Sequence, residues 1–246
     1  GISRYHREGN GDLIYEIGSG YFGCRTEDGK FSPEKFAGQA ASPQIKMIEL
    51  KLSQGAKPGH GGMLPAAKIT KEISDARGVP MGQDCISPAS HSAFSTPIEM
   101  MQFLGQLRDL SGGKPVGFKL CIGLRHEFMA ICKAMLDTGL SPDFITVDGG
   151  EGGTGAGPLV FTDHVALPFK VAFPRVYRAM AERDLQEDIV FIGAGRLGLP
   201  EVGLPLVFAT TFGFWCIAPD RLVWAWCSDW CGLAVSGAGK VTRSLL

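Results

Sequence analysis

The sequence predicts an α/β protein in which parallel strands alternate with helices. Three observations support this. Apolar runs rich in β-branched residues recur, and amphipathic stretches with capping residues separate them. Loops rich in glycine or charged residues follow nearly every run. A doubly wound sheet gathers its ligand-binding loops at one switch point, whereas a (β/α)8 TIM barrel brings all of them to one mouth. Both architectures fit the alternation, and the distribution of the loops favours a partial barrel.

Apolar runs mark the predicted strands, at residues 46–52, 115–122, 143–147 and 188–192, with a less certain one at 212–217. Each of the first four precedes a loop rich in glycine or charge. Their short length and β-branched content are typical of strands buried in a parallel sheet.

Capping residues mark three predicted helices between these strands. Residues 32–40 begin with Ser32 as N-cap and Pro33 at the first helical position. In the segment 96–113, Thr96 and Glu99 form a capping box, and two consecutive glycines end the helix. The segment 126–139 places its apolar residues on one face and stops at a glycine.

The composition is that of a soluble globular protein. The chain has 246 residues, 45% hydrophobic and 20% charged, with a net charge of −1, which argues against a nucleic-acid-binding protein. Its seven cysteines are scattered and odd in number, which predicts reduced thiols and a cytoplasmic location. No histidine or cysteine shows metal-ligand spacing, so no metal site is predicted. The apolar stretch 202–219 contains two prolines, which favours a buried strand and loop over a membrane span.

Glycine is abundant, with 34 residues in the chain. The stretch DGGEGGTGAGP, residues 148–158, contains six glycines and can bring backbone N–H groups close to a flat ring or a phosphate. A flexible loop is the alternative, but the preceding strand and the carboxylates of Asp148 and Glu151 favour a site. The stretch GAGRLG, residues 193–198, has the same character with one cation, as expected for a phosphate pocket.

Lysine and arginine side chains provide the candidate electrostatic contacts. Lys119 lies inside an apolar predicted strand, so it must be paired or face a polar cavity unless that strand is an edge strand with the lysine in solvent. In flavoprotein barrels such a lysine can stabilise the reduced flavin. Lys57, Lys68 and Arg77 form a cationic set that suits a substrate with carboxylates, although a solvated surface is the alternative.

Three segments carry a family resemblance: KMIELKLSQGAKPGHGGMLPAAKIT, ISPASHSAFSTPIEMMQFLGQLRDLSGGKPVGFKL and DFITVDGGEGGTGAGP. They resemble the FMN-binding synthase domain of glutamate synthase, from residue 1 to about 199. The resemblance implies a (β/α)8 barrel with FMN at its C-terminal mouth. It also implies a reaction in which ammonia and 2-oxoglutarate form 2-iminoglutarate, which is then reduced to L-glutamate.

The resemblance also implies roles for single residues. Lys57 and Arg77 resemble the residues that hold the dicarboxylate, and Glu151, which stands where the family has aspartate, is a third predicted catalytic residue. The predicted cofactor-binding residues are Gln54, Lys119, Gly149, Gly152, Gly153, Thr154, Gly193 and Gly195. Amidotransferase and electron-donor partners, and a homo-oligomer, are further expectations from the family.

Several features depart from the family pattern. Met63 replaces a substrate-contacting glutamine, and the late cysteines do not reproduce the spacing of the family's iron–sulfur cluster. The missing initiator Met predicts a fragment, divided here into a barrel part, 1–206, and an aberrant C-terminal segment, 207–246. Two alternative functions follow: a non-catalytic remnant, and another FMN barrel, such as a 2-hydroxy-acid oxidase with His164 as its base.

Overall fold

A parallel five-stranded sheet forms the centre of the computed structural model, which describes residues 1–151 and 157–195. Its strands lie in the order β1-β2-β5-β6-β7, and each pairs in parallel with its neighbour. They span β1 Leu13–Ile17, β2 Ile45–Lys51, β5 Val116–Leu120, β6 Phe144–Asp148 and β7 Val190–Ala194. The α/β fold and the first four predicted strands are therefore confirmed, whereas β1 was not predicted and the fifth prediction, 212–217, lies outside the described residues.

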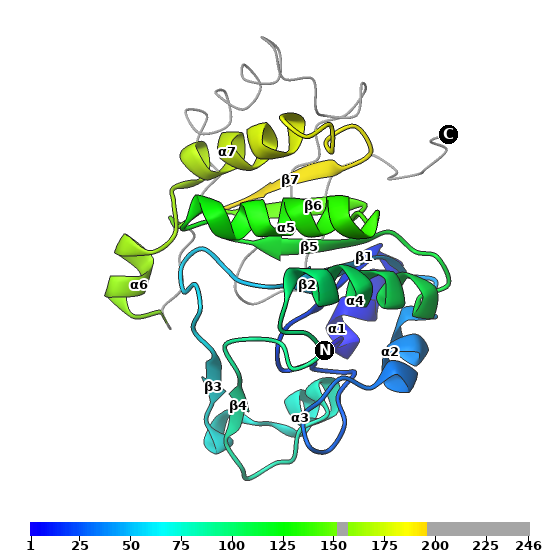
Figure 1. Cartoon of the computed structure of the whole chain (residues 1–246). Helices are drawn as coiled ribbons and strands as arrows, with labels where there is room; N and C mark the ends of the chain where they lie inside the picture. Colours follow the sequence, from blue (N-terminus) through cyan, green and yellow to red (C-terminus); the bar gives the residue numbers. More distant parts are fainter. Residues whose placement is uncertain (152–156, 196–246) are drawn as a thin grey trace.

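Helices of the described chain cover one face of this sheet (Figure 1). The three predicted helices are confirmed as α2 Pro33–Ala40, α4 Pro97–Leu110 and α5 Arg125–Thr138. The predicted capping box of α4 is present, and Gly139 ends α5 with φ +66°, a conformation that glycine adopts without strain. The remaining helices are α1 Arg4–Arg7, α3 Lys71–Arg77, α6 Leu159–His164 and α7 Phe169–Ala181, with 3-10 turns at Glu8–Asn10 and Ala66–Lys68.

The main hydrophobic core lies between the sheet and these helices. Strand residues that point to this face include Ile17, Leu50 and Phe118, each 1% exposed or less, and they pack against α2, α4, α5 and α7. The strand order follows the chain without reversal. A sheet of this kind, with helices on one side, differs from the doubly wound arrangement, in which the order reverses and helices cover both faces.

A small separate unit interrupts the alternation between β2 and β5. It contains β3 Gly62–Leu64, β4 Cys85–Ser87 and α3, with β3 and β4 paired antiparallel (Figure 1). Its own small core consists of Ile69, Val79 and Cys85. The unit contains most of the segment that holds the predicted substrate-binding cations Lys57, Lys68 and Arg77.

Within residues 1–151 and 157–195, every helix is too short or too polar to cross a membrane. The described residues likewise contain no group of three His, Cys, Asp or Glu side chains that could hold a metal ion. The predicted C-terminal segment, 207–246, lies outside the described residues.

Candidate functional site

The face of the sheet opposite the helices carries two layers of side chains. Nearest the start of the strands is an apolar layer, made of Ile14, Met47, Phe144 and Ile192. One pleat further on, the same strands present a polar layer, made of Glu16, Glu49, Lys51, Lys119, Thr146 and Asp148. Registered pairs in a parallel sheet share a face, and the pairs Glu16↔Glu49, Lys51↔Lys119 and Lys119↔Thr146 place these groups together.

Lys119 lies at the centre of the polar layer. Its strand, β5, runs between β2 and β6, and the residue is only 2% exposed, so the alternative of a solvent-facing edge-strand lysine is wrong. Its Nζ lies 3.7 Å from Oδ2 of Asp148, which is buried at the end of β6. This partner reduces the cost of burying an ammonium group.

Glu49 is the most buried carboxyl group of the layer, with 1% exposure. One of its oxygens accepts a hydrogen bond of 2.5 Å from the hydroxyl of Thr146. Burial, and then the charge of Glu16, raise the pKa of Glu49 to about 7, although Lys119, Thr146 and Lys51 act in the opposite direction. The side chain therefore exchanges its proton near neutral pH.

Glu16 has the opposite character, although its carboxylate lies in the same layer. Its Oε1 lies 3.2 Å from Nζ of Lys51. Burial favours the neutral acid, but Lys51 and Lys119 together hold its pKa below the usual value. Glu16 therefore remains charged where Glu49 titrates, and the layer contains carboxyl groups with separated pKa values.

Glycine loops from three strands meet above the polar layer. The N–H of Gly55, after β2, donates to Oδ2 of Asp148 at 2.9 Å, and the N–H of Gly149, after β6, donates to the carbonyl of Ala194 at 3.0 Å. A Cβ on Gly55 would lie 1.8 Å from the carbonyl oxygen of Gly149, so only glycine fits there. Gly195, after β7, has φ +136° and lies beside Gly149.

Most of the predicted cofactor-binding residues in the described part of the chain lie in this region. Gln54 is half-buried in the loop after β2, Gly193 is in β7 beside Val147 of β6, and Lys119, Gly149 and Gly195 are in the places given above. Gly152, Gly153 and Thr154 lie outside the described residues. The structure also adds Glu49, Thr146 and Asp148, which were not predicted to act on Lys119. The signal was present in β2, where Glu49 and Lys51 stand two residues apart in an apolar run.

The three predicted catalytic residues have different surroundings. Lys57 is half-buried in the loop after β2, where its N–H donates to the carbonyl of Gln54 at 3.3 Å. The carboxylate of Glu151 accepts the N–H of Phe169 at 2.9 and 2.7 Å, which fastens the loop to the first turn of α7. Arg77, at the end of α3, lies 4.7 Å above the ring of Phe22, and its carbonyl accepts the N–H of Gly23 at 3.1 Å.

Other side chains singled out in the sequence lie on the surface of the small unit or of α6. Lys68 is exposed at the end of the 3-10 turn Ala66–Lys68, and Met63 is 68% exposed on β3. His164 is exposed at the end of α6. Its exposure gives no support to a role as a buried catalytic base.

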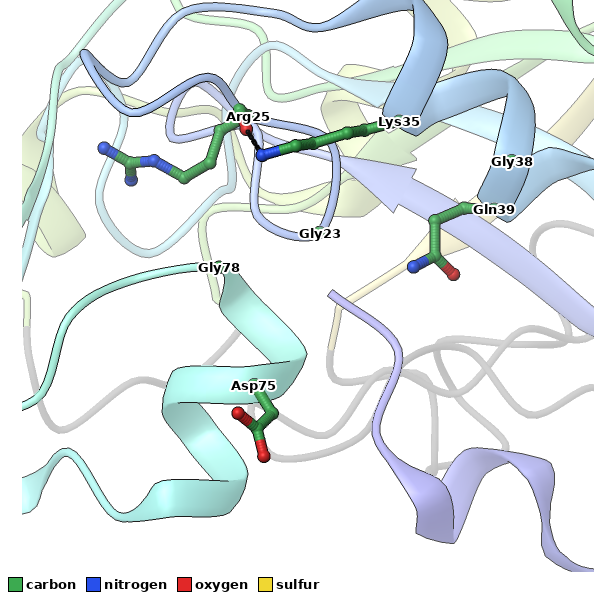
Figure 2. A pocket seen from close by; sticks show the side chains of 7 residues that line it. All are labelled: Gly23, Arg25, Lys35, Gly38, Gln39, Asp75 and Gly78. Carbon is green, nitrogen blue, oxygen red and sulfur yellow. Dashed lines mark hydrogen bonds between the residues drawn. The ribbon is translucent and has the colours of Figure 1, made fainter.

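A surface pocket of about 360 Å³ lies elsewhere, between α2 and α3 (Figure 2). Arg25, Lys35 and Asp75 contribute to its lining, but none of the predicted cofactor-binding residues does. The ammonium of Lys35 already donates to the carbonyl of Arg25 at 2.9 Å, as the figure shows. We therefore place the candidate site at the polar layer rather than at this pocket.

Comparisons with known proteins identify the relatives of this chain. A family model described as a conserved region in glutamate synthase matches residues 1–213. The chain is 42% identical over 201 residues to a glutamate synthase large subunit-like protein of Bacillus subtilis, covering 82% of this chain and 38% of that protein. It is 36% identical over 184 residues to an archaeal glutamate synthase [NADPH] of Methanocaldococcus jannaschii, covering 74% of this chain and 33% of that protein.

A more distant relative is a ferredoxin-dependent glutamate synthase of the genus Antithamnion. It is 30% identical over 207 residues, which cover 83% of this chain and 12% of that protein. The matched part of this chain corresponds to 38%, 33% and 12% of the length of these three curated relatives. The chain therefore spans little more than a third of the length of the first of them, and less of the other two.

Proposed function

The chain belongs to the glutamate synthase family, and we propose that it forms the FMN-binding part of an oxidoreductase that converts 2-oxoglutarate to L-glutamate. In this proposal the described sheet is five strands of a (β/α)8 barrel. The consecutive strand order and the single helix-covered face support a barrel. The polar layer then lies inside the barrel, below its C-terminal mouth.

One observation carries the proposal: a buried ammonium group lies beneath glycine loops from three strands. Lys119, paired with Asp148, supplies the charge, while Gly55, Gly149 and Gly195 let the three loops pack closely against one another above it. This arrangement suits a flat, electron-rich ring that becomes more negative when it is reduced. The residues present therefore fit FMN.

We assign the contacts of FMN to residues of these loops. Gln54 and Lys119 would lie against the flavin ring, and the loop from Gly149, including Gly152, Gly153 and Thr154, would follow its edge. Gly193 and Gly195 would begin the phosphate-binding segment. When bound and reduced, FMN would supply the hydride that reduces the C=N bond of 2-iminoglutarate, and it would become oxidised in doing so.

The protein's own residues would bind and orient the diacid. We propose that Lys57, on the loop after β2, pairs with one carboxylate and that Arg77 pairs with the other. The placement of Lys57 supports its role, because Gly55 in the same loop is bonded to Asp148. Glu151 would contribute by holding its loop against Phe169 at the start of α7.

Ammonia is the second substrate in this proposal. Its addition to the 2-oxo group releases water and gives 2-iminoglutarate, and a hydride and a proton complete L-glutamate. An amidotransferase partner would deliver the ammonia, and an electron donor would restore the reduced cofactor. The family contains both NADPH-named and ferredoxin-named relatives, which are the two donor classes to test.

Activity of the purified protein tests this function directly. We expect FMN at a ratio near 1:1 and formation of L-glutamate from 2-oxoglutarate and ammonium in the presence of dithionite-reduced methyl viologen. A protein that binds no added FMN, or that binds FMN but forms no L-glutamate, would contradict the proposal.

Matched substitutions test the two cations. Lys57→Ala should raise KM for 2-oxoglutarate about 30-fold or more, the equivalent of losing one charge-assisted pair of about 2–3 kcal/mol. Arg77→Ala should raise this KM by a similar factor, because it removes the partner of the second carboxylate. An unchanged KM in either variant removes that residue from the substrate site, and Lys68→Ala is the control, because Lys68 is exposed.

A further inference from the structure

Glu49 is a buried acid, and only one of its two carboxyl oxygens accepts a hydrogen bond from a described residue. Thr146 donates to one of its oxygens at 2.5 Å, but no described residue donates to the other oxygen, Oε1. Leaving a buried carboxylate oxygen without a donor is costly, and protonation removes most of that cost. The geometry therefore favours a neutral Glu49 at the centre of a charged layer.

The charges that face Glu49 come from every neighbouring strand that carries one. Glu16 lies on β1, Lys51 on β2 itself, Lys119 on β5 and Asp148 on β6, two residues beyond Thr146 on the same face. Strand β7 presents Ile192 and Ala194, which carry no charge. Lys51 pairs with Glu16 at 3.2 Å, and Lys119 pairs with Asp148 at 3.7 Å. Glu49 is the carboxyl group of the layer that belongs to neither of these ion pairs.

We propose that Glu49 is a positioning residue that takes up and releases one proton inside the polar layer, so that the net charge of the layer, Lys119 included, switches between zero and −1. This inference rests on the proposed function, in which FMN lies against Lys119. Glu49 would act through Lys119 rather than by touching FMN. With Glu49 neutral, more of the positive charge of Lys119 is available to stabilise the reduced cofactor.

The titration of the two glutamates supports this inference. Burial and Glu16 raise the pKa of Glu49 to about 7, whereas Lys51 and Lys119 keep the pKa of Glu16 low despite its burial. Of these two glutamates, Glu49 is therefore the one that changes its charge near neutral pH. The consequence is a reduction potential of bound FMN that falls more steeply with rising pH around neutrality than it would without this group.

The first test measures the reduction potential of bound FMN between pH 5.5 and 8.5 in the wild-type protein and in Glu49→Gln. Glutamine keeps the shape and can accept the hydrogen bond of Thr146, but it cannot ionise. At pH 8 we expect the variant to favour reduced FMN about fivefold more than the wild type, with the difference vanishing below pH 6. Glu27→Gln, which changes an exposed acid, is the control and should follow the wild type.

The second test uses protein freed of FMN, and so does not depend on the cofactor site. The folded-state pKa of Glu49 is raised above its ordinary value of 4.5, so its stabilising contribution is complete below that value and is lost as the pH rises towards 7. The Tm of the wild type, compared with that of Glu49→Gln, should therefore fall by about 5 °C between pH 4.5 and 8.

The outcomes separate the two proposals. Melting curves that keep a constant difference at every pH would overturn the proton switch at Glu49. Bound FMN whose potential has the same pH profile in both proteins would overturn its effect on the cofactor while leaving the proposed function intact. A protein that binds no FMN would overturn the proposed function, and this inference about the cofactor with it.

Discussion

The apolar and polar layers of the sheet are built by the same strands, yet they have opposite chemistry. Phe144 and Thr146 are neighbours on one face of β6, and Met47 and Glu49 are neighbours on one face of β2. The apolar layer stabilises the sheet, while the polar layer concentrates charges next to the carboxyl ends of the strands. This division is expected where the carboxyl end of a parallel sheet carries the active site and the opposite end carries stability.

Phe144→Ala should produce the largest loss of stability. The ring is 1% exposed and packs against the glycine at position 117, where a Cβ would lie 2.5 Å from it. We expect a loss of about 3–5 kcal/mol in the free energy of unfolding, measured by denaturant titration, with an unchanged potential of any bound FMN. Leu159→Ala is the control, because Leu159 is 77% exposed. A loss below about 1 kcal/mol would contradict the role of the apolar layer.

Asp148→Ala should have the next largest effect, and it should act on the polar layer. The substitution leaves Lys119 buried without its carboxylate and removes the acceptor of the Gly55 N–H. We expect a loss of about 3 kcal/mol in the free energy of unfolding. Adding Lys119→Met to this variant should recover part of that loss, because the buried charge is then gone. Strictly additive effects would show that the two side chains do not interact.

Gly55→Ala should have a smaller effect on stability than the two variants above, and it should also weaken FMN binding. A methyl group there would meet the Gly149 carbonyl at 1.8 Å, so the loops after β2 and β6 must separate. We expect a loss of about 2 kcal/mol in unfolding free energy and weakened FMN binding, measured by denaturation and fluorescence titration. Gly38→Ala on α2, where nothing lies within 4 Å, is the control and should be neutral or slightly stabilising. Unaltered FMN affinity in Gly55→Ala would remove this loop from the cofactor site.

The helices that the sequence predicted correctly are those whose first or last residues carry clear capping signals. The capping box of Thr96 and Glu99 and the stop at Gly139 specified α4 and α5, because both are short-range interactions. Strand β1 was missed although its five residues include aromatic and β-branched side chains. Helix α7 was also missed, since Pro174 lies inside it and proline normally ends a helical pattern.

The candidate site was predictable only in part. Lys119 stood out because a lysine in an apolar strand needs a partner, but the sequence did not identify Asp148 as that partner. Pairing across strands depends on register, which emerges from tertiary packing. Lys57 and Arg77 were grouped by their proximity in the sequence, whereas the structure places Arg77 on α3 in the small unit, against Phe22.

The reduction potential of bound FMN in Lys119→Met tests the central claim most directly. Methionine keeps a flexible chain of similar length but has no charge to stabilise a reduced flavin. We predict a more negative potential than in the wild type, in a protein that is still folded and still binds FMN measurably. A potential equal to that of the wild type would contradict the claim that the buried ammonium of β5 faces the cofactor.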